Sequence, residues 1–381
     1  MKVLHVNVSA ICDKFYLTLF SYLKNEGITQ TVYCPYSKRE NADSDVTHTI
    51  EKYREAKIEL SLLPIKKNID RLLYSSKIQK YSSHILNEID NNKYDIIHAH
   101  SLYTDGGTAF LLSKKLQIPY IVAVRGADTT AFMKYYRFLA PFARKILENA
   151  SKVVFISPDL KRITLEYLYR NSKTPNFLKN SVTIPNGVDR FWLSNEYRKS
   201  TKPQGIVNII QVGRLVKYKN TDKSILAVKK LHQSGIDVTL NILGKGPEED
   251  RLRNLIQKND ISDSVNLIGF VSDRQLLLEH YRNSDIFLLP SNGETFGIAY
   301  IEAMTQGLPV IGLCGSGVSG YLADKQVGQF IKDAKPETIC DAVKACINNY
   351  SIYSRNTNKE IYDFDWNGII RQYSQIYSEI K

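Results

Sequence analysis

Two glutamates stand eight positions apart in the stretch "SNGETFGIAYIEAM", residues 291–304. Glu294 precedes a short glycine-containing segment, and Glu302 follows it. No histidine, cysteine or aspartate lies within the stretch, so it holds no metal-ligand set and no nucleophile relay of its own. A carboxylate accepts two hydrogen bonds from neighbouring hydroxyls but repels phosphate. The interval therefore suits a ligand that carries hydroxyl groups at two ends.

The same stretch predicts the start of a helix. Ile298, Ile301 and Met304 recur at helical spacing after the buried strand "DIFLLPS", which places the helix start near Gly297. The first turn of a helix offers free backbone N–H groups to an anion, and glycine allows a ligand to approach closely. A nucleotide sugar, with phosphate between two sets of hydroxyls, fits this arrangement. The alternative is two structural carboxylates, one exposed in a loop and one paired with a basic side chain.

Two cations follow a predicted strand earlier in the same half. The strand Val207–Val212 ends at Gly213, and Arg214 and Lys219 come directly after it. Anionic ligands bind at the carboxyl ends of parallel strands, where arginine offers a planar fork and lysine a point charge. The alternative is a pair of solvated basic residues. The glycines of "LGKGPEEDRL" are interpreted as a structural turn, because the three acidic residues after them would repel phosphate.

The elements that must position these residues alternate along the chain. Short apolar runs are followed by patterns of helical period, which predicts parallel sheets covered on both faces. The predicted strands are Val3–Val8, Thr31–Cys34, Ile96–His98, Tyr120–Val124, Val153–Ile156, Val182–Ile184, Val207–Val212, Val238–Leu243, Val265–Ile268, Ile286–Leu289 and Pro309–Gly312.

The series breaks once, at the polar stretch 194–205, which is interpreted as a linker. We therefore predict an α/β protein of two doubly wound, Rossmann-like domains, residues 1–193 and 206–365, facing a central cleft. Residues 366–381 are expected to form a C-terminal helix that packs back on the first domain. The length of 381 residues agrees with two domains.

Composition narrows the class of partner. The net charge of +12 indicates an acidic partner, either an anionic membrane or a phosphorylated substrate. Nucleic acid is disfavoured, because the chain has no zinc-finger spacing, RNP-like segment or dense basic tail. Five cysteines without a CxxC pair indicate reduced thiols in a cytosol. No apolar run approaches the ~20 residues of a membrane span.

Several segments together carry a resemblance to a known family. "VGRLVKYKN", "LGKGPEEDRL" and "LLPSNGETFGIAYIEAMTQGLPVI" follow one another in the second half, and "YDIIHAHS", "IVAVRGAD" and "VTIPNGVD" occur in the first. In this order they closely resemble the retaining glycosyltransferases of family 4, which have the GT-B fold. The resemblance covers nearly the whole chain and is more specific in the second half.

The resemblance implies a donor, an acceptor and a location. The donor is a nucleotide-diphosphate sugar, with UDP favoured, and neither a metal ion nor another cofactor is expected. The acceptor is a glycan or a lipid-linked glycan, in bacterial surface polysaccharide biosynthesis such as that of capsule or lipopolysaccharide. The location is the cytoplasm, with possible peripheral attachment to the inner face of the cytoplasmic membrane.

Residue roles on the donor side also follow from the resemblance. Arg214 and Lys219 match the pair that holds the donor diphosphate. Glu302 matches the acid that binds the ribose hydroxyls, and Glu294 the acid that binds those of the donor sugar. The remaining donor-binding positions are Gly213, Phe296, Gly297 and Ile298 near the phosphates, and Phe270 and Val271 at the nucleobase. Positive groups fixed beside the departing diphosphate would make Mg²⁺ unnecessary, and the family is thought to react on the front face of the sugar.

The chain departs from the family pattern at two places. The loop after the first strand, "NVSAICDK", contains Ser9 but no glycine. Arg125 stands where many members have a histidine, and arginine cannot act as a general base. It could instead clamp the diphosphate or an acceptor phosphate; the alternative is an ion pair with Asp128. The predicted acceptor side comprises His100, Asp128 and Ser9, with Arg125 counted among the catalytic residues.

His98 and His100 invite a metal interpretation that we do not adopt. Their interval is interpreted as placing them on opposite faces of a strand, with one histidine in the core and His100 at the strand end near the cleft. No metal site is predicted.

The segment "TAFMKYYRFLAPFARKILENASK" combines aromatic and basic residues. It is interpreted either as a helix on a membrane surface or as a helix whose aromatic face packs on the sheet. Rival functions are a nucleotide-sugar epimerase or phosphorylase of the same fold, a catalytically silent binding subunit of a polysaccharide assembly complex, and a nucleic-acid binder suggested by charge alone.

Overall fold

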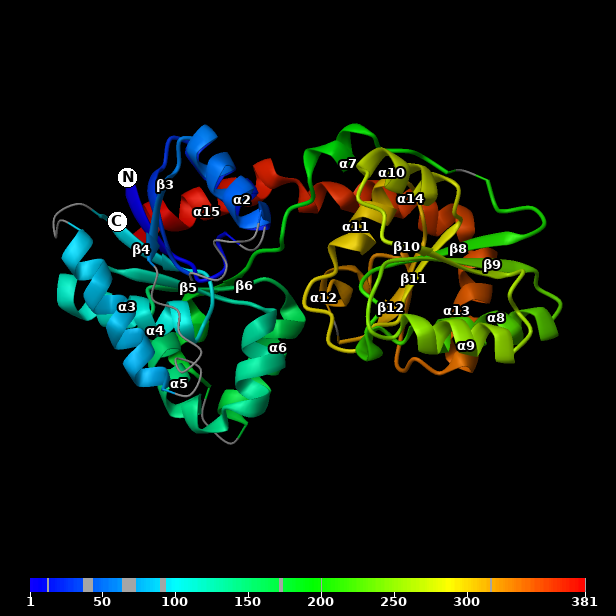
Figure 1. The fold of residues 1–381 in the computed structure, drawn as a ribbon, viewed down its shortest axis with the longest axis horizontal. Helices are drawn as coiled ribbons and strands as arrows, with labels where there is room; N and C mark the ends of the chain where they lie inside the picture. The colour runs from blue at the N-terminus through cyan, green and yellow to red at the C-terminus, as the bar shows by residue number, and fades with distance from the viewer. Residues whose placement is uncertain are drawn as a thin grey trace. The chain divides into compact units, whose positions relative to one another are not determined.

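The computed structural model describes residues 1–11, 14–36, 44–63, 73–89, 94–170, 174–199, 201–315 and 317–380. The chain forms two compact units (Figure 1). The first unit comprises Met1–Pro185 and Trp366–Lys381, and the second comprises Asn186–Asp365. Each unit is built on one parallel sheet, as the alternation of apolar runs predicts.

The first unit has a seven-stranded sheet in the order β3-β2-β1-β4-β5-β6-β7. Its strands are β1 (Lys2–Val6), β2 (Thr29–Pro35), β3 (Glu59–Leu63), β4 (Ile96–Ala99), β5 (Tyr120–Val124), β6 (Lys152–Phe155) and β7 (Ser181–Thr183). Its helices are α1 (Lys14–Asn25), α2 (Ser44–Glu55), α3 (Tyr74–Glu88), α4 (Thr104–Leu116), α5 (Ala140–Asn149), α6 (Pro158–Tyr169) and α15 (Trp366–Ile380), with short turns η3 (Asp128–Met133), η4 (Arg137–Leu139) and η5 (Asn176–Asn180).

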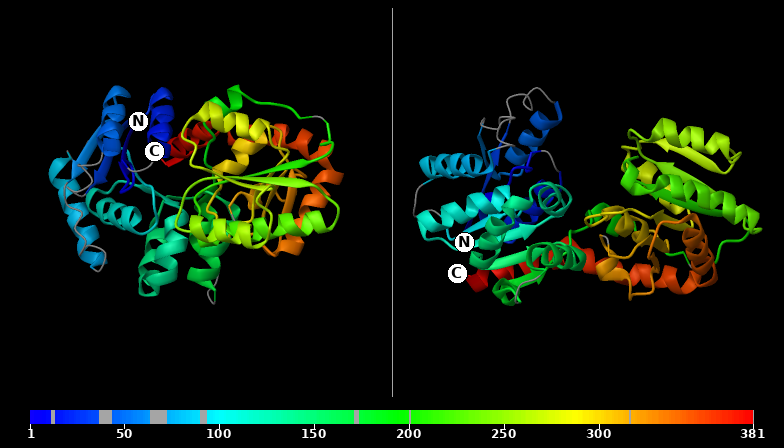
Figure 2. Two further views of the ribbon diagram at one scale, coloured as in Figure 1. Left: turned by 45° about the vertical axis from the view of Figure 1, so that its right-hand side comes forward. Right: turned by 90° about the horizontal axis from the view of Figure 1, so that it is seen from below.

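Successive strand residues serve two separate cores in this unit. Val3 and Ile121 lie in the cluster under α1, α2 and α15, whereas Leu4 and Val122 lie in the cluster under α3, α4 and α5. Alternate side chains of a strand point to opposite faces, so a strand buried on both faces reads as a continuous apolar run. Helix α15, red in Figures 1 and 2, brings the C-terminus beside the N-terminus.

The second unit has a six-stranded sheet in the order β10-β9-β8-β11-β12-β13. Its strands are β8 (Val207–Val212), β9 (Val238–Leu243), β10 (Val265–Gly269), β11 (Ile286–Leu289), β12 (Val310–Leu313) and β13 (Gly328–Ile331). Its helices are α7 (Arg190–Ser194), α8 (Thr221–Gln233), α9 (Glu249–Lys258), α10 (Arg274–Arg282), α11 (Ile298–Thr305), α12 (Ser319–Leu322), α13 (Pro336–Asn348) and α14 (Tyr350–Glu360), with turns η6 (Lys217–Lys219) and η7 (Ile361–Phe364). Within the ranges described, no helix is both long and apolar enough to cross a bilayer.

Each sheet contains one point at which the strand order reverses. The reversal lies between β1 and β4 in the first unit and between β8 and β11 in the second. Loops that leave neighbouring strands at such a point run to opposite faces of the sheet, and ligands bind where they part. The fold therefore marks the carboxyl ends of β8 and β11 as the place for a ligand site in the second unit.

The boundary between the units differs from the predicted one. The second unit begins at Asn186, so the predicted linker 194–205 lies inside it. Tyr197 donates its backbone N–H to the Thr305 carbonyl at 2.8 Å, and Lys199 lies 3.6 Å from the Asp285 carboxylate. The polar composition that suggested a linker belongs to a segment fastened along the surface of the second unit.

Candidate active site

Arg214 lies at the carboxyl end of β8 with its side chain exposed. No acidic side chain of the described ranges pairs with it. A guanidinium in this state can turn its donors toward the oxygens of a phosphate without first breaking an ion pair. The position agrees with the predicted role on the donor diphosphate, which stays a prediction.

Lys219 and Glu294 form an ion pair in the second unit. The two side chains are 12% and 15% exposed, so the pair is partly shielded from water. The loops that carry them are joined, because Asn292 donates its backbone N–H to the Tyr218 carbonyl at 2.7 Å. Asn220 adds a side-chain hydrogen bond to the Pro290 carbonyl at 2.7 Å. The loops after β8 and β11 thus hold opposite charges together at the reversal point.

Helix α11 begins at the predicted place. Gly297 is its N-cap in the left-handed conformation, with a φ of 88°, which confirms the predicted helix start. A Cβ atom on Gly297 would lie 2.7 Å from the Tyr300 ring, so a side chain is excluded there. Phe296 is buried and can offer a ligand only its backbone, whereas Ile298 is partly exposed. The first-turn N–H groups of α11 are the anion-binding donors that this helix start supplies.

Glu302 lies one turn into α11 and is partly buried. Tyr281 donates its hydroxyl to the Glu302 carboxylate at 3.2 Å, and the Trp192 side chain also hydrogen-bonds to it. Burial raises the pKa of Glu302 to about 7, and these two hydrogen bonds oppose the rise. A carboxylate oriented in this way is suited to accept hydrogen bonds from ligand hydroxyls.

The partners of Glu302 were not identified from the sequence. Asp189, the N-cap of α7, pairs with Arg274 of α10 at 2.9 Å, and the charges of both act on Glu302. The segment "VTIPNGVD", which ends at Asp189, was noted only as a landmark of the first half. The segment crosses the boundary between the units, and only its last four residues, 186–189, belong to the second unit together with Glu302.

Exposed apolar side chains surround the end of β10. Phe270 is 69% exposed, and Ile268 and Leu276 are also exposed. Val271 is partly exposed beside them. An exposed aromatic ring such as that of Phe270 suits stacking of a nucleobase. Phe270 and Val271 are therefore accessible for the predicted contact with the base.

The glycine turn after β9 is structural, as its acidic neighbours suggested. A Cβ atom on Gly244 would lie 1.9 Å from the Gly213 carbonyl oxygen, and one on Gly246 would lie 2.2 Å from that of Leu215. Leu215 also donates its backbone N–H to the Lys245 carbonyl at 3.0 Å. The glycines let this turn pack directly against the loop that carries Arg214, and so hold that loop in place.

In the first unit, Arg125 is nearly buried at the end of β5. Its guanidinium carbon lies 4.9 Å from the Phe15 ring centroid and 5.3 Å from that of Tyr16, both on α1. Such contacts hold the cation against aromatic faces. The backbone N–H of Arg125 donates to the Asp128 carboxylate at 2.8 Å.

Asp128 has a different role from the acceptor contact that was predicted. Its fully buried carboxylate accepts backbone N–H groups of Leu102 at 3.0 Å and Tyr103 at 3.4 Å, in addition to that of Arg125. Because it is fully buried, it offers no surface that an acceptor could contact. Asp128 instead fastens the loops that follow β4 and β5. Burial raises its pKa to about 6, with the three backbone donors acting against the rise.

Asp105 is a second buried carboxyl that was not identified from the sequence. It accepts the backbone N–H of Val8 at 3.1 Å and so anchors the glycine-free loop after β1. Burial raises its pKa to about 7. Ser9, the predicted acceptor residue of that loop, is partly exposed and donates its backbone N–H to Asn7 at 2.9 Å.

The interpretation of His98 and His100 is wrong. Residues two apart along a strand share a face, and both imidazoles lie on the same side with ring centroids 4.2 Å apart. His100 is fully buried and hydrogen-bonds to His5 at 3.0 Å, so it does not face an acceptor. Burial lowers the pKa of all three histidines.

These three histidines also have the spacing of a metal site. Ligand nitrogens of His5, His98 and His100 all lie within 4.8 Å of one another. The nearby charge of Arg125, which further lowers the pKa of His98 and His100, would oppose a bound cation. The expectation that the protein needs no metal stays a prediction.

The basic aromatic segment does not form one helix. It is divided among η3, η4 and α5, which begins at Ala140 with a proline in its first turn. Phe132 stacks on Tyr103 with a centroid distance of 4.7 Å, whereas Tyr135 and Phe138 are exposed. Part of the aromatic surface therefore packs inside the first unit, and the contact of the exposed part with a membrane stays a prediction.

Comparison with known proteins identifies the family. The model described as Glycosyltransferase Family 4 matches residues 14–190, and that described as Glycosyl transferases group 1 matches residues 194–363. An uncharacterized glycosyltransferase of Methanocaldococcus jannaschii is 25% identical over 318 residues, 82% of each chain. The alpha-monoglucosyldiacylglycerol synthase of Acholeplasma laidlawii is 23% identical over 237 residues, 58% of each chain.

The solved structures show the same fold. The Anabaena protein HepE in complex with UDP is 16% identical, with a TM-score of 0.73 over 100% of both chains. This neighbour confirms the predicted fold class. The chain belongs to the family 4 glycosyltransferases, enzymes of the GT-B fold.

Proposed function

We propose that the protein is a metal-independent, retaining glycosyltransferase that uses a nucleotide-diphosphate sugar, with UDP as the favoured nucleotide. The observation that carries the proposal is the arrangement at the ends of β8 and β11. Exposed Arg214, the Lys219–Glu294 pair and the start of α11 converge on one edge of the second unit's sheet. Fixed positive groups at this edge would stabilise the charge that develops on a departing diphosphate.

The two glutamates take different parts in this proposal. Glu302, oriented by Tyr281 and Trp192, would accept hydrogen bonds from the ribose hydroxyls. Glu294 would exchange part of its pairing with Lys219 for the hydroxyls of the donor sugar. Transfer with retention would then follow by attack of the acceptor on the face from which the diphosphate departs. The solved relative that was crystallised with UDP supports the choice of nucleotide.

The proposed acceptor is a lipid-linked glycan of a bacterial surface polysaccharide, at the inner face of the cytoplasmic membrane. A relative named as a glucosyldiacylglycerol synthase supports a lipid acceptor. Exposed Tyr135 and Phe138, together with basic Lys134 and Arg137, offer the surface that an anionic bilayer would contact. We place a peripheral membrane contact at this segment.

A thermal-shift panel of nucleotide-diphosphate sugars, with and without EDTA, tests the donor and the metal together. We expect one donor, a UDP-sugar, to raise the melting temperature by several degrees, with the same rise in EDTA. A rise that EDTA abolishes would contradict metal independence, and no rise with any donor would contradict the proposed function. Donor incubated without acceptor provides the check on the rivals, because an epimerase converts it alone and a phosphorylase requires free phosphate.

A further inference from the structure

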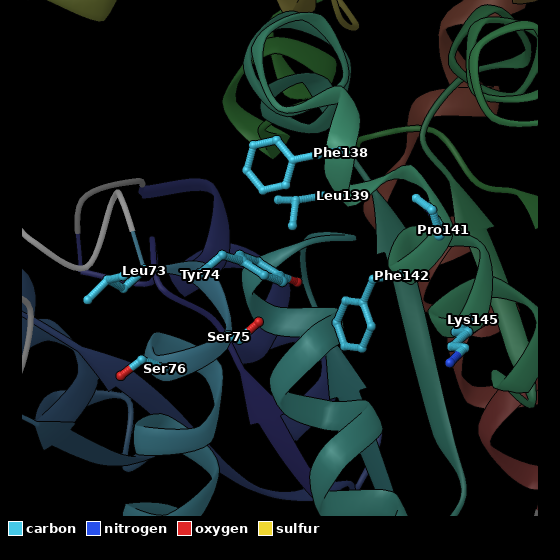
Figure 3. A pocket seen from close by; sticks show the side chains of 9 residues that line it. All are labelled: Leu73, Tyr74, Ser75, Ser76, Phe138, Leu139, Pro141, Phe142 and Lys145. Atoms are coloured by element: carbon cyan, nitrogen blue, oxygen red, sulfur yellow. The ribbon is translucent and has the colours of Figure 1, made fainter.

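Two of the exposed large apolar side chains described in the first unit line one groove. Within the described residues of this unit, the exposed large apolar side chains are Leu73, Tyr135 and Phe138, which are 55%, 67% and 71% exposed. Leu73 and Phe138 line the same groove (Figure 3). Tyr135 precedes Phe138 by three residues in the chain. Apolar exposure concentrated in this way marks a binding surface, whereas scattered exposure needs no explanation.

The groove runs between the start of α3 and the start of α5. Its volume is about 680 Å³, and its apolar wall includes Tyr74 and Phe142, whose rings meet edge to face at 5.8 Å (Figure 3). Lys145 of α5 lines the groove, and none of the described lining residues is acidic. The groove therefore combines apolar side chains with one lysine, which suits an apolar chain that ends in an anionic group.

Contacts connect the groove with the predicted acceptor side of the first unit. Tyr74 donates its hydroxyl to the Tyr103 carbonyl at 2.7 Å, and Tyr103 donates its backbone N–H to Asp128 at 3.4 Å. Asp128 also binds the backbone of Arg125. The groove is therefore linked through Tyr74 and Tyr103 to Asp128, which holds the loop that carries Arg125.

We propose that this groove binds a lipid phosphate, with its alkyl or isoprenoid chain against Tyr74, Phe138 and Phe142 and its phosphate at Lys145. The proposal rests on the proposed function, since it names the lipid part of the acceptor and assigns it a binding site in the first unit. Each methylene buried in such a groove strengthens binding about fourfold, from the ~0.8 kcal/mol that burial of one CH₂ contributes.

Butyl, octyl and dodecyl phosphate, each below its micelle concentration, are the probes for isothermal titration calorimetry with the full-length protein. We expect the dissociation constant to fall steeply with chain length in wild type. Phe138→Ser should weaken dodecyl phosphate at least fivefold, and the matched loss of an exposed apolar side chain, Ile352→Ser on α14, should leave it unchanged. Lys145→Gln should weaken dodecyl phosphate but not dodecanol, whereas Lys115→Gln on α4 should affect neither.

Three results would overturn the proposal. The first is a dissociation constant that does not depend on chain length, and the second is an equal loss in Phe138→Ser and Ile352→Ser. The third is binding to phosphatidylglycerol vesicles that Phe138→Ser abolishes, without binding of any soluble alkyl phosphate; the face would then contact the bilayer only. Titration of the same samples with UDP distinguishes failure of the groove proposal from failure of the proposed function. If wild type did not bind UDP, that would contradict the donor site but not the groove.

Discussion

At the scale of single residues, the two cations of the second unit's site differ in whether an acidic side chain already pairs with them. Arg214 is exposed and can bind an anion directly, whereas Lys219 forms an ion pair with Glu294. A donor that uses both cations must share or break the Lys219–Glu294 pair. The pair is therefore a device that keeps two charges in place and partly shielded when no donor is bound, and its energy enters the affinity for the diphosphate.

Glu294→Gln should separate binding from transfer. Removing the carboxylate charge leaves Lys219 free for phosphate, so UDP should bind as tightly as in wild type or more tightly. Transfer of the sugar should fall by about 10²–10³-fold, the range seen when one stabilising group is removed from an active site. The measurements are UDP affinity by calorimetry and product formation from the UDP-sugar.

Arg253→Gln serves as the control for surface charge, since Arg253 pairs with Glu249 on the outside of α9. Arg253→Gln should change neither the affinity for UDP nor the rate of sugar transfer. If Glu294→Gln lowered UDP affinity tenfold and left transfer intact, Glu294 would be a phosphate-side structural residue and its role on the sugar would be wrong.

At the scale of elements, buried carboxyls fasten the loops at the carboxyl edge of the first sheet. Asp105 holds the loop after β1, and Asp128 holds those after β4 and β5. Both have a raised pKa because of burial, so their protonated forms favour the folded state. The three buried histidines on the opposite side of β1 and β4 have lowered pKa values.

Asp105→Asn should stabilise the first unit more at pH 8 than at pH 5. The folded pKa of Asp105 is about 7 against 3.8 ordinarily, so the folded state holds a proton that the unfolded state has lost between these values. The stability that this carboxyl contributes therefore falls as the pH rises above 3.8 and is fully lost once the pH has passed about 7. Asparagine keeps the acceptor for the Val8 N–H without the charge. Melting temperatures by circular dichroism at pH 5 and pH 8 measure the difference.

Glu26→Gln, at an exposed position near the end of α1, is the control for loss of a carboxylate and should shift the melting temperature little at either pH. A larger gain for Asp105→Asn at pH 5 than at pH 8 would contradict the raised pKa. The buried histidines have lowered pKa values, so they destabilise the folded state as the pH falls below 6.5. Their effect is the same in wild type and in Asp105→Asn, and it cancels when the two melting temperatures are compared.

Most strands follow from local patterns of the sequence, and two do not. Strands β3 and β13 were missed because each lies at the edge of its sheet and is only partly buried, so neither has the continuous apolar run of a central strand. The helix start at Gly297 was predicted correctly, because both the apolar spacing and the glycine indicate it. Asp105, Trp192 and Tyr281 could not be predicted, since their roles depend on contacts between elements that are distant in the chain.

At the scale of the whole molecule, two sheets with one reversal point each explain where the chemistry-bearing residues gather. Arg214 and Glu294 follow the two strands at the reversal of the second sheet, β8 and β11, although 80 residues separate them. The sequence predicts this meeting through the rule for parallel sheets. It could not place the boundary at Asn186, because a polar surface segment and a linker have the same composition.

Binding of nucleoside diphosphate by the second unit is the central claim, and calorimetry of UDP and GDP with wild type and Arg214→Ala tests it most directly. We predict that wild type binds one UDP per chain and that Arg214→Ala weakens it at least about tenfold, the cost of a charged hydrogen bond, while Arg253→Ala leaves it unchanged. Wild type that binds neither nucleotide, or Arg214→Ala that binds UDP as tightly as wild type, would contradict the assignment of the β8–β11 edge as the donor site.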